Sequence, residues 1–329
     1  MILIGATDIG PARYLLALDR YLAKPNLWIG SELSQPLLAQ YGHRSQQHWQ
    51  EDLKADLVLT GTANGPCLDK DLINWAIERG VPSVSVIEHW SWYRRRYQVD
   101  EMLVLPDYII VNDQIAKDQA IAEGLPVERL FVGGNPWLEH LSTEVSPAFD
   151  ICSWRDRLGL PQGRIIVFVS EALRDDFPKS SADYLGYDEF EVLKTLIDIA
   201  SKDDVVVIKL HPEEPSDKYT TLLSSGKVYS IGHASLFELA KGADFIVGMA
   251  SMLLIELAML RDNVISYRPN ARLPFIGNTL GATIQVNDIE SLSNLFLLRN
   301  TSQIKDTSFR NRFQRSGDRI GKFLGDLMA

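Results

Sequence analysis

The segment VVVIKLHP, residues 205–212, ends in side chains suited to an anionic ligand. Its apolar start is typical of a buried strand, and Pro212 would end the strand's hydrogen bonding, which places His211 at the carboxyl end. Side chains alternate between the two faces of a strand, so Lys209 and His211 are expected to point the same way. A cation and an imidazole in that position could hold a diphosphate. A histidine that only caps a turn is the alternative.

A second segment, GADFIVGMAS followed by MLLIE, covers residues 242–256. The pattern predicts a strand, a turn and then a helix for which Ser251 is the N-cap. The free amides at such a helix start, including that of Met252, can accept a phosphate. Glu256 lies further into the apolar helix, where a carboxylate needs a partner because an unpaired buried charge is costly. Ribose hydroxyls would supply that partner, and a salt bridge elsewhere in the chain is the alternative.

The first half of the chain carries candidates for proton transfer. Glu88 and His89 follow the strand expected over residues 84–87, and either side chain at a strand's carboxyl end could take the proton from an attacking hydroxyl group. Asp8, in the loop after the first expected strand, is a further candidate base. These three residues are the predicted catalytic groups.

An aromatic and basic segment follows directly, WSWYRRR at residues 90–96. Trp92 together with Arg94, Arg95 and Arg96 could hold an acidic or phosphorylated sugar, since arginine pairs with carboxylates and phosphates and stacks on aromatic rings. A solvated basic loop with ordinary aromatic packing is the alternative.

The elements that must position these residues alternate between short apolar runs and helical periodicity, the pattern of parallel sheets covered by helices. We expect strands at residues 2–4, 56–60, 84–87, 107–111, 164–169, 204–210, 245–247 and 263–267. The prediction is an α/β protein of two Rossmann-like, doubly wound domains, 1–145 and 146–307, whose strand ends face one another across a cleft. The first domain would hold the acceptor and the second the nucleotide.

Residues 308–329 form a separate C-terminal segment. Phe309, Phe313, Ile320 and Phe323 recur there among basic residues, which predicts an amphipathic helix. We expect its apolar side to pack back across the body of the protein. Peripheral contact with a membrane surface is the alternative.

Length, charge and cysteine content exclude several classes of protein. The 329 residues suffice for two domains of ordinary size. Lys and Arg total 33 against 43 Asp and Glu, and the net charge of −10 disfavours nucleic acid as a partner. No apolar run could span a membrane and Asp8 follows the start too closely for a signal peptide, so we expect a cytoplasmic protein. The two cysteines are far apart in the sequence and predict no disulfide framework.

Several motifs of other enzyme classes are missing. The sequence contains no HExxH, no GxSxG, no Walker P-loop and no GxGxxG. Metalloprotease, serine hydrolase, nucleoside triphosphatase and dinucleotide-dependent chemistry therefore lack the residues that would perform them. We expect neither a metal ion nor a cofactor, because lysine, arginine and helix amides can stabilise a departing nucleotide.

In their order along the chain, KLHP, GADFIVGMAS and the following glutamate resemble the nucleotide-binding half of GT-B glycosyltransferases and of the related UDP-GlcNAc 2-epimerases. The likeness is strongest to bacterial capsule, polysialyl and glycerophosphate polymer transferases with an HP motif. Residues 106–136, PDYIIVNDQIAKDQAIAEGLPVERLFVGGNP, are similar to the segment before the interdomain crossover in those enzymes. The resemblance implies a site for a UDP- or CMP-sugar formed by Lys209, His211, Pro212, Ser251, Met252 and Glu256.

The leading hypothesis is a metal-independent glycosyltransferase that passes sugar from a nucleotide-sugar donor to a carbohydrate acceptor, building a surface or capsular polysaccharide from the cytoplasmic side of the membrane. An isomerase related to UDP-GlcNAc 2-epimerases is one alternative, although those enzymes have a Glu-Ala-Gly type segment where this chain has Glu88-His89-Trp90. A non-catalytic nucleotide-sugar-binding or assembly protein is another. Glu171, after the strand at 164–169, is not assigned to phosphate because two anions would repel each other.

Overall fold

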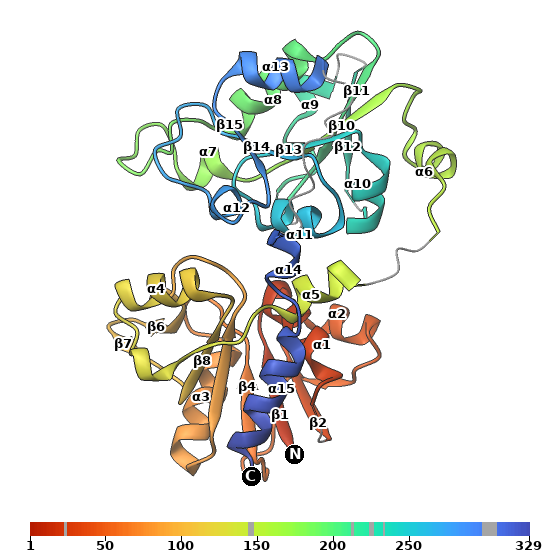
Figure 1. Ribbon diagram of the computed structural model, residues 1–329. Coiled ribbons are helices and arrows are strands. Elements are labelled where there is room, and N and C mark those ends of the chain that lie inside the picture. The colour runs from red at the N-terminus through yellow and green to blue at the C-terminus, as the bar shows by residue number, and fades with distance from the viewer. Residues whose placement is uncertain (23–24, 144–147, 212–213, 224–226, 233, 298–307) are drawn as a thin grey trace. The chain divides into compact units, whose positions relative to one another are not determined.

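The chain folds into two compact α/β units. The computed structural model describes residues 1–22, 25–143, 148–211, 214–223, 227–232, 234–297 and 308–329. One unit comprises Met1–Thr143 with Arg310–Ala329, and the other comprises Glu144–Phe309. Each is built on one parallel sheet with helices against it (Figure 1), so the predicted fold class of two parallel-sheet α/β domains is confirmed. The predicted boundary at 145/146 lies outside the described residues.

The sheet of the first unit has seven strands, all paired in parallel. Its central strands are apolar and fully buried because helices cover both faces. From one edge to the other the order is β3 (Ser45–Gln46), β2 (Asn26–Gly30), β1 (Ile2–Ala6), β4 (Leu57–Thr60), β5 (Ser83–Ile87), β8 (Tyr108–Val111) and β9 (Leu130–Val132).

Four helices connect strands of this sheet, namely α1 (Ile9–Asp19), α2 (Gln35–Gln40), α3 (Leu68–Arg79) and α4 (Gln114–Ala122). Helix α5 (Pro136–Thr143) follows the last strand, and α15 (Ser316–Leu327) comes at the end of the chain. Between β5 and β8 lie a short 3₁₀ turn and a small hairpin, namely η1 (Arg95–Tyr97), β6 (Gln98–Val99) and β7 (Met102–Leu103). A second 3₁₀ turn, η2 (Val127–Arg129), precedes β9.

Helix α15 belongs to the first unit although it ends the chain. Ile320 and Leu324 are fully buried in the same core as β1 and β4, and the ring of Phe323 stacks on Phe131 with centroids 4.1 Å apart. The carboxylate of Glu139 caps the helix, accepting hydrogen bonds from the amide of Arg315 at 2.6 Å and from that of Gly317 at 2.9 Å. These contacts fix the helix on the unit.

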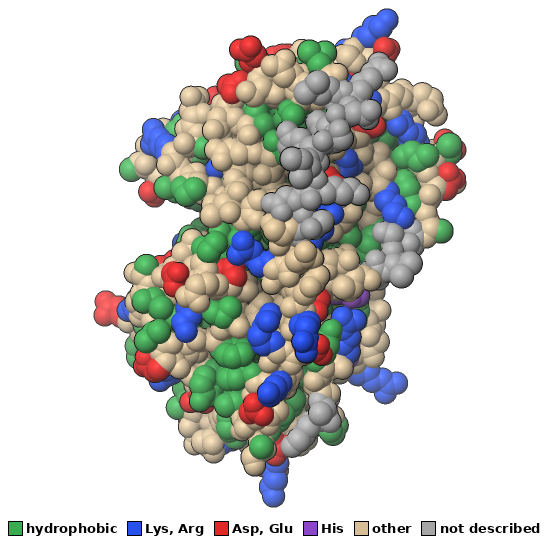
Figure 2. Space-filling view, in the orientation of Figure 1, with side chains coloured by type: hydrophobic (Ala, Val, Ile, Leu, Met, Phe, Trp, Pro, Cys, Tyr) green, Lys and Arg blue, Asp and Glu red, His purple; other side chains and the backbone are tan. Residues whose placement is uncertain are grey.

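The apolar side of α15 is therefore occupied by the protein's own core. Figure 2 shows basic side chains over this helix, and Arg319 and Lys322 are among its exposed residues. No described helix is long and apolar enough to cross a membrane.

The second unit is built on a six-stranded sheet, again with all pairs parallel. Strand β10 makes six pairings with one neighbour and three with the other, and its residues Ile165–Val169 are almost completely buried. The order is β12 (Val228–Ile231), β11 (Asp204–Lys209), β10 (Arg164–Val169), β13 (Phe245–Gly248), β14 (Val264–Tyr267) and β15 (Ile284–Val286).

Most helices of this unit begin at a side chain that caps them. Asp188 and Ser235 each form a complete capping box with a glutamate three residues later. The helices are α6 (Ile151–Leu158), α7 (Leu173–Asp176), α8 (Glu189–Ile199), α9 (Thr220–Leu223), α10 (Leu236–Gly242), α11 (Met252–Leu260), α12 (Ile276–Thr279) and α13 (Ile289–Leu297). Helix α14 (Ser308–Asn311) precedes the return to the first unit.

Replacement of Gly317 by alanine tests the docking of α15. A Cβ atom there would lie 2.1 Å from the ring of Tyr21, whereas one at Gly325 would meet no atom within 4 Å. We expect Gly317→Ala to lower the free energy of unfolding by about 1–3 kcal/mol through overpacking. Gly325→Ala, on the same helix, should be neutral or stabilising by up to about 1 kcal/mol. Urea denaturation measures both, and equal effects of the two changes would show that the close contact does not hold the helix.

Candidate functional site

The carboxyl edge of the second sheet brings three loops side by side. They follow β11, β10 and β13, which are consecutive neighbours in the sheet and run in the same direction. The first loop starts at Leu210 and His211, the second at Ser170 and Glu171, and the third leads through Ala250 into α11. His211 and the start of α11, which sequence reasoning assigned to the same ligand, thus share one sheet edge, two strands apart.

The predicted residues of this edge occupy different surroundings. His211 is exposed, and Lys209 is half-buried with its Nζ donating to the carbonyl oxygen of Leu210 at 2.6 Å. Ser251 is the N-cap of α11 as predicted, its hydroxyl accepting from the amide of Leu253 at 3.2 Å. Met252 begins the helix. Pro212 lies outside the described residues.

Glu256 is half-buried in the middle of α11. It lies four residues after the first residue of that helix, which places it about 6 Å further from the sheet edge along the helix axis. A ribose bound by Glu256 would therefore lie beside α11 and not at the start of that helix. This role of Glu256 remains a prediction.

Glu171 takes a position that sequence reasoning did not assign. Its carboxylate accepts a hydrogen bond from the amide of Ala250 at 2.8 Å, just before the first turn of α11. Burial raises the pKa of Glu171 to about 7, although the amides of Ala250, Met249 and Ser251 favour the ionised form. A carboxyl group with that pKa is half-protonated near neutrality. The turn that was expected to receive a phosphate holds this carboxylate instead.

A buried ion network fixes the loops after β10 and β11. Lys218 Nζ lies 2.6 Å from a carboxylate oxygen of Glu189 and 2.6 Å from one of Glu214, whose side chains are 0% and 1% exposed. Glu214 also accepts from the Ser170 hydroxyl at 2.8 Å and from the His211 amide at 2.7 Å. One glutamate thus joins both loops, and the shared ammonium compensates the charge that burial would otherwise penalise.

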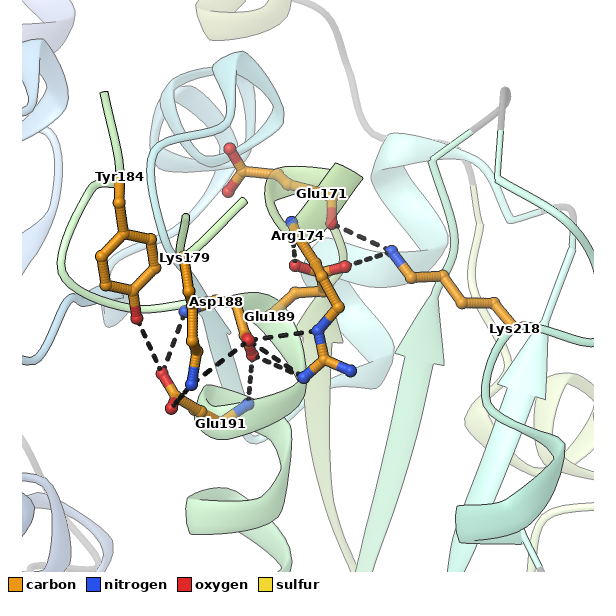
Figure 3. A network of polar contacts seen from close by, with 8 residues as sticks. All are labelled: Glu171, Arg174, Lys179, Tyr184, Asp188, Glu189, Glu191 and Lys218. Carbon is orange, nitrogen blue, oxygen red and sulfur yellow. Dashed lines mark hydrogen bonds and ion pairs between the residues drawn. The ribbon is translucent and has the colours of Figure 1, made fainter. Parts of the chain in front are cut away.

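Figure 3 shows how the network continues to the start of α8. The Arg174 guanidinium makes a bidentate pair with Asp188, with distances of 2.9–3.1 Å, and the Arg174 amide donates to Glu189 at 2.8 Å. Asp188 is itself the N-cap of α8. The loop that carries Glu171 is therefore held on one side by Glu214 and on the other by the charged groups at the start of α8.

The carboxyl edge of the first sheet gathers a second polar cluster. Arg96 is buried and lies 3.7 Å from a carboxylate oxygen of Glu88. Its guanidinium also approaches the Thr62 hydroxyl at 3.5 Å and donates to the Ser91 carbonyl at 3.2 Å. Glu88 packs against the first turn of α1, where a Cβ on Gly10 would lie 3.1 Å from its oxygen. Glycine at that position therefore leaves room for the carboxylate.

Burial raises the pKa of Glu88, Arg96 opposes this, and the charge of Asp8 adds to it. His89 behaves in the opposite way, because burial and the nearby Arg96 lower its pKa to about 3. Its Nδ1 lies 2.8 Å from the Ser91 hydroxyl. Of the two adjacent candidates, Glu88 is the one whose pKa is shifted upward, and His89 is the one whose pKa is shifted downward.

Asp69 is the residue of this cluster that sequence reasoning missed. It is the second residue of α3, its side chain is 1% exposed, and burial raises its pKa to about 7, with Asp8 adding to the effect and Thr7 and Lys70 opposing it. In the described part of the chain, neither of its carboxyl oxygens has a well-formed hydrogen-bond partner. An aspartate in the first turn of a helix is common, so the sequence gives no signal that this one is functional.

The aromatic and basic segment does not act as one unit. Arg96 points inward to Glu88, whereas Arg94 and Arg95 are exposed, and Arg95 lies over the ring of Trp92 at 5.3 Å from its centroid. Trp92 is 48% exposed. The three arginines predicted to hold one acceptor are thus divided between a buried site and the surface.

No three His, Cys, Asp or Glu side chains of the described residues are arranged to hold a metal ion.

Comparison with known proteins is informative at the level of structure. No family model and no curated protein matches the sequence. The structure is similar to that of the Methanocaldococcus jannaschii UDP-GlcNAc 2-epimerase in complex with UDP-GlcNAc and UDP, with a TM-score of 0.68 and 16% identity over 99% of each chain. The Neisseria meningitidis UDP-GlcNAc 2-epimerase bound to UDP-GlcNAc gives a TM-score of 0.65 at 14% identity, covering 99% of this chain and 100% of that one. Anabaena HepE in complex with UDP and glucose gives 0.63 at 14% identity, covering 99% and 98%.

The chain has the GT-B fold. At this level of identity the likeness establishes the architecture, and it does so over both units rather than over a fragment.

The comparison corrects the leading hypothesis from the sequence. Several of the solved structures that match over the whole chain are UDP-GlcNAc 2-epimerases, so the glycosyltransferase hypothesis is contradicted and the epimerase alternative is favoured. The error has a physical cause: KLHP and the α11 start indicate anion binding, which an isomerase of a nucleotide sugar needs as much as a transferase does. The acceptor role of Trp92, Arg94, Arg95 and Arg96 depended on the transferase hypothesis and is not carried further.

The raised pKa of Asp69 makes a testable contribution to stability. A carboxyl group whose pKa is higher in the folded than in the unfolded state stabilises the fold at low pH, and this contribution is lost as the pH rises through about 7. Asp69→Asn should therefore be more stable than the unchanged protein at pH 8, by on the order of 1–4 kcal/mol, and similar to it near pH 4.

Urea denaturation followed by tryptophan fluorescence measures this difference, because six of the seven tryptophans lie in the first unit. Asp71→Asn is the matched control, since Asp71 is an exposed carboxylate on the same helix. If Asp69→Asn shifts stability by the same amount at pH 4 and pH 8, the Asp69 carboxyl group does not titrate near neutrality.

Proposed function

We propose that the protein is a nucleotide-sugar isomerase of the UDP-GlcNAc 2-epimerase kind. The observation that carries the proposal is the match over 99% of both chains to an epimerase structure that contains UDP-GlcNAc and UDP. The candidate groups for the nucleotide diphosphate lie in the second unit, and the candidate acid and base groups lie in the first.

The nucleotide side of the proposal rests on the carboxyl edge of the second sheet. The amides around Ala250 and the α11 start are oriented to receive an anion, as their hydrogen bond to a carboxylate illustrates. His211 follows the adjacent loop, which Glu214 holds through the His211 amide. The exposed imidazole can reach solvent and hence a ligand, while the Glu214 contact restricts its backbone.

The acid and base groups follow from what an epimerisation requires. To invert a carbon that bears one hydrogen, the enzyme removes a proton from one face and returns a proton to the other. Each group works best with a pKa near the working pH. Asp69, with a pKa of about 7, meets this condition, and the pKa of Glu88 in the same cluster is shifted upward, toward it. Arg96 beside Glu88 stabilises its ionised form once the proton has left.

Incubation with UDP-GlcNAc alone tests the proposal, because an isomerase needs no acceptor. Proton NMR of the anomeric region should show a second nucleotide sugar, the epimer at C2, growing to a constant ratio. Glu88→Gln and Asp69→Asn should each lower the rate by about 100-fold or more, the usual loss when an acid or base group is removed.

Asp71→Asn, which changes the charge of the same helix at its exposed surface, should leave the rate unchanged. Calorimetry separates the remaining outcomes. If UDP-GlcNAc binds but no epimer forms, the isomerase proposal fails and a non-catalytic nucleotide-sugar-binding protein is left.

A further inference from the structure

The amides before α11 already hold an anion, and it belongs to the chain. Ala250 N donates to the Glu171 carboxylate at 2.8 Å, and the amides of Met249 and Ser251 also favour its ionised form. Ser251 caps the helix that starts at Met252. These are the groups to which the proposed diphosphate would bind. A phosphate and an ionised Glu171 cannot both use them without close repulsion between like charges.

The surroundings of Glu171 favour a neutral carboxyl group. Beyond burial, the charge of Glu214, in the loop after β11, raises the pKa of Glu171. The charge of Glu171 in turn adds to the raised pKa of Tyr187, in the segment before α8. Lys218 does not reach the carboxylate, since its Nζ donates to the carbonyl oxygen of Glu171 at 3.3 Å and lies between two other glutamates. Arg268, which follows β14, lowers the pKa of Tyr187 and so opposes the effect of Glu171 on that group.

Within the described residues no ion pair reaches the Glu171 carboxylate, so its compensation comes from main-chain amides. A carboxylate that main-chain amides hold, and whose pKa is raised to about 7, is easily neutralised by a proton. The loop that bears it is nevertheless firmly placed, through Ser170 to Glu214 and through Arg174 to Asp188. The backbone of Glu171 is thus held in place, while its carboxyl group can gain or lose a proton near neutral pH.

We propose that Glu171 is an internal anion that competes with the diphosphate of the ligand for the α11 amides, so that the ligand binds together with one proton, which the carboxylate takes up. The inference rests on the proposed nucleotide-sugar site and adds its specificity-determining residue. The balance is simple: ionised Glu171, one proton from solvent and the dianionic ligand give a complex in which Glu171 is a neutral acid. Affinity then falls as the pH rises.

Isothermal titration calorimetry with UDP-GlcNAc counts that proton directly. Titrations at pH 8 in two buffers of different ionisation enthalpy give the number of protons taken up. UDP-GlcNAc is the right probe because its diphosphate is esterified at both ends and keeps its charge between pH 6 and 8, whereas the terminal phosphate of UDP titrates near pH 6. We expect uptake of nearly one proton at pH 8, and an affinity about tenfold lower than at pH 6 because the competent neutral form is scarcer.

Glu171→Gln isolates this contribution from any proton that His211 takes up. The amide side chain keeps an acceptor oxygen for Ala250 but carries no charge. The variant should bind about tenfold more tightly than the unchanged protein at pH 8, and its proton uptake should fall by close to one. Asp175→Asn is the matched control, because Asp175 is an exposed carboxylate of α7 on the same loop and its removal should change neither quantity.

The outcomes are distinct. Binding by the unchanged protein without proton uptake at pH 8 overturns the inference whether or not the variant folds, and so does weaker binding by Glu171→Gln. Absence of binding in all proteins between pH 6 and 8 overturns the anion site itself. Proton-linked binding without formation of the C2 epimer would leave the inference standing while the isomerase proposal fails. Epimer formation without proton uptake would support the isomerase proposal and overturn the inference about Glu171.

Discussion

The acid and base groups proposed for this protein depend on the burial of carboxyl groups. A carboxylate removed from water is destabilised unless an opposite charge or several hydrogen bonds replace its hydration, and otherwise its pKa rises. The buried acids of the chain have two kinds of surroundings, and the first kind supplies a cation or helix amides. Glu189 and Glu214 share Lys218, Asp188 pairs with Arg174, and Glu139 is bonded by two helix amides. Those acids hold loops and helices in place. At the two sheet edges, by contrast, burial dominates and keeps carboxyl groups protonatable.

Most interior strands of the sheets were predictable because they carry continuous apolar runs, although the interior strand β2 was not expected. The expected strand at 164–169 is found at Arg164–Val169, and those at 204–210 and 263–267 differ from the observed bounds by one residue. The strands that were not expected include all four sheet edges, β3, β9, β12 and β15. Edge strands here have two to four residues, and several of these are only half-buried, so no apolar run marks them. Each becomes a strand because a buried neighbour offers it a hydrogen-bonding partner.

The candidate sites were predictable where a motif ends a strand or starts a helix. Ser251 as the N-cap of α11 and Glu88 at the end of β5 follow from local pattern alone. Asp69 and Glu171 could not be assigned in this way, because their significance lies in burial and in neighbours that are distant in sequence: Thr7 and Asp8 for one, Ala250 and Glu214 for the other. The same limit explains the incorrect transferase hypothesis. Anion-binding motifs identify a phosphate partner, whereas the reaction depends on which acids burial makes protonatable.

Carboxyl ¹³C NMR of protein labelled at aspartate and glutamate measures the pKa of each carboxyl group in the folded protein. The account predicts that two carboxyl resonances titrate close to pH 7, that Asp69→Asn removes one of them and that Glu171→Gln removes the other. If every carboxyl group of the folded protein is ionised by about pH 5, as the ordinary pKa values of aspartate and glutamate would give, burial does not control these groups. The acid–base assignment and the proton-linked ligand site would then both be contradicted.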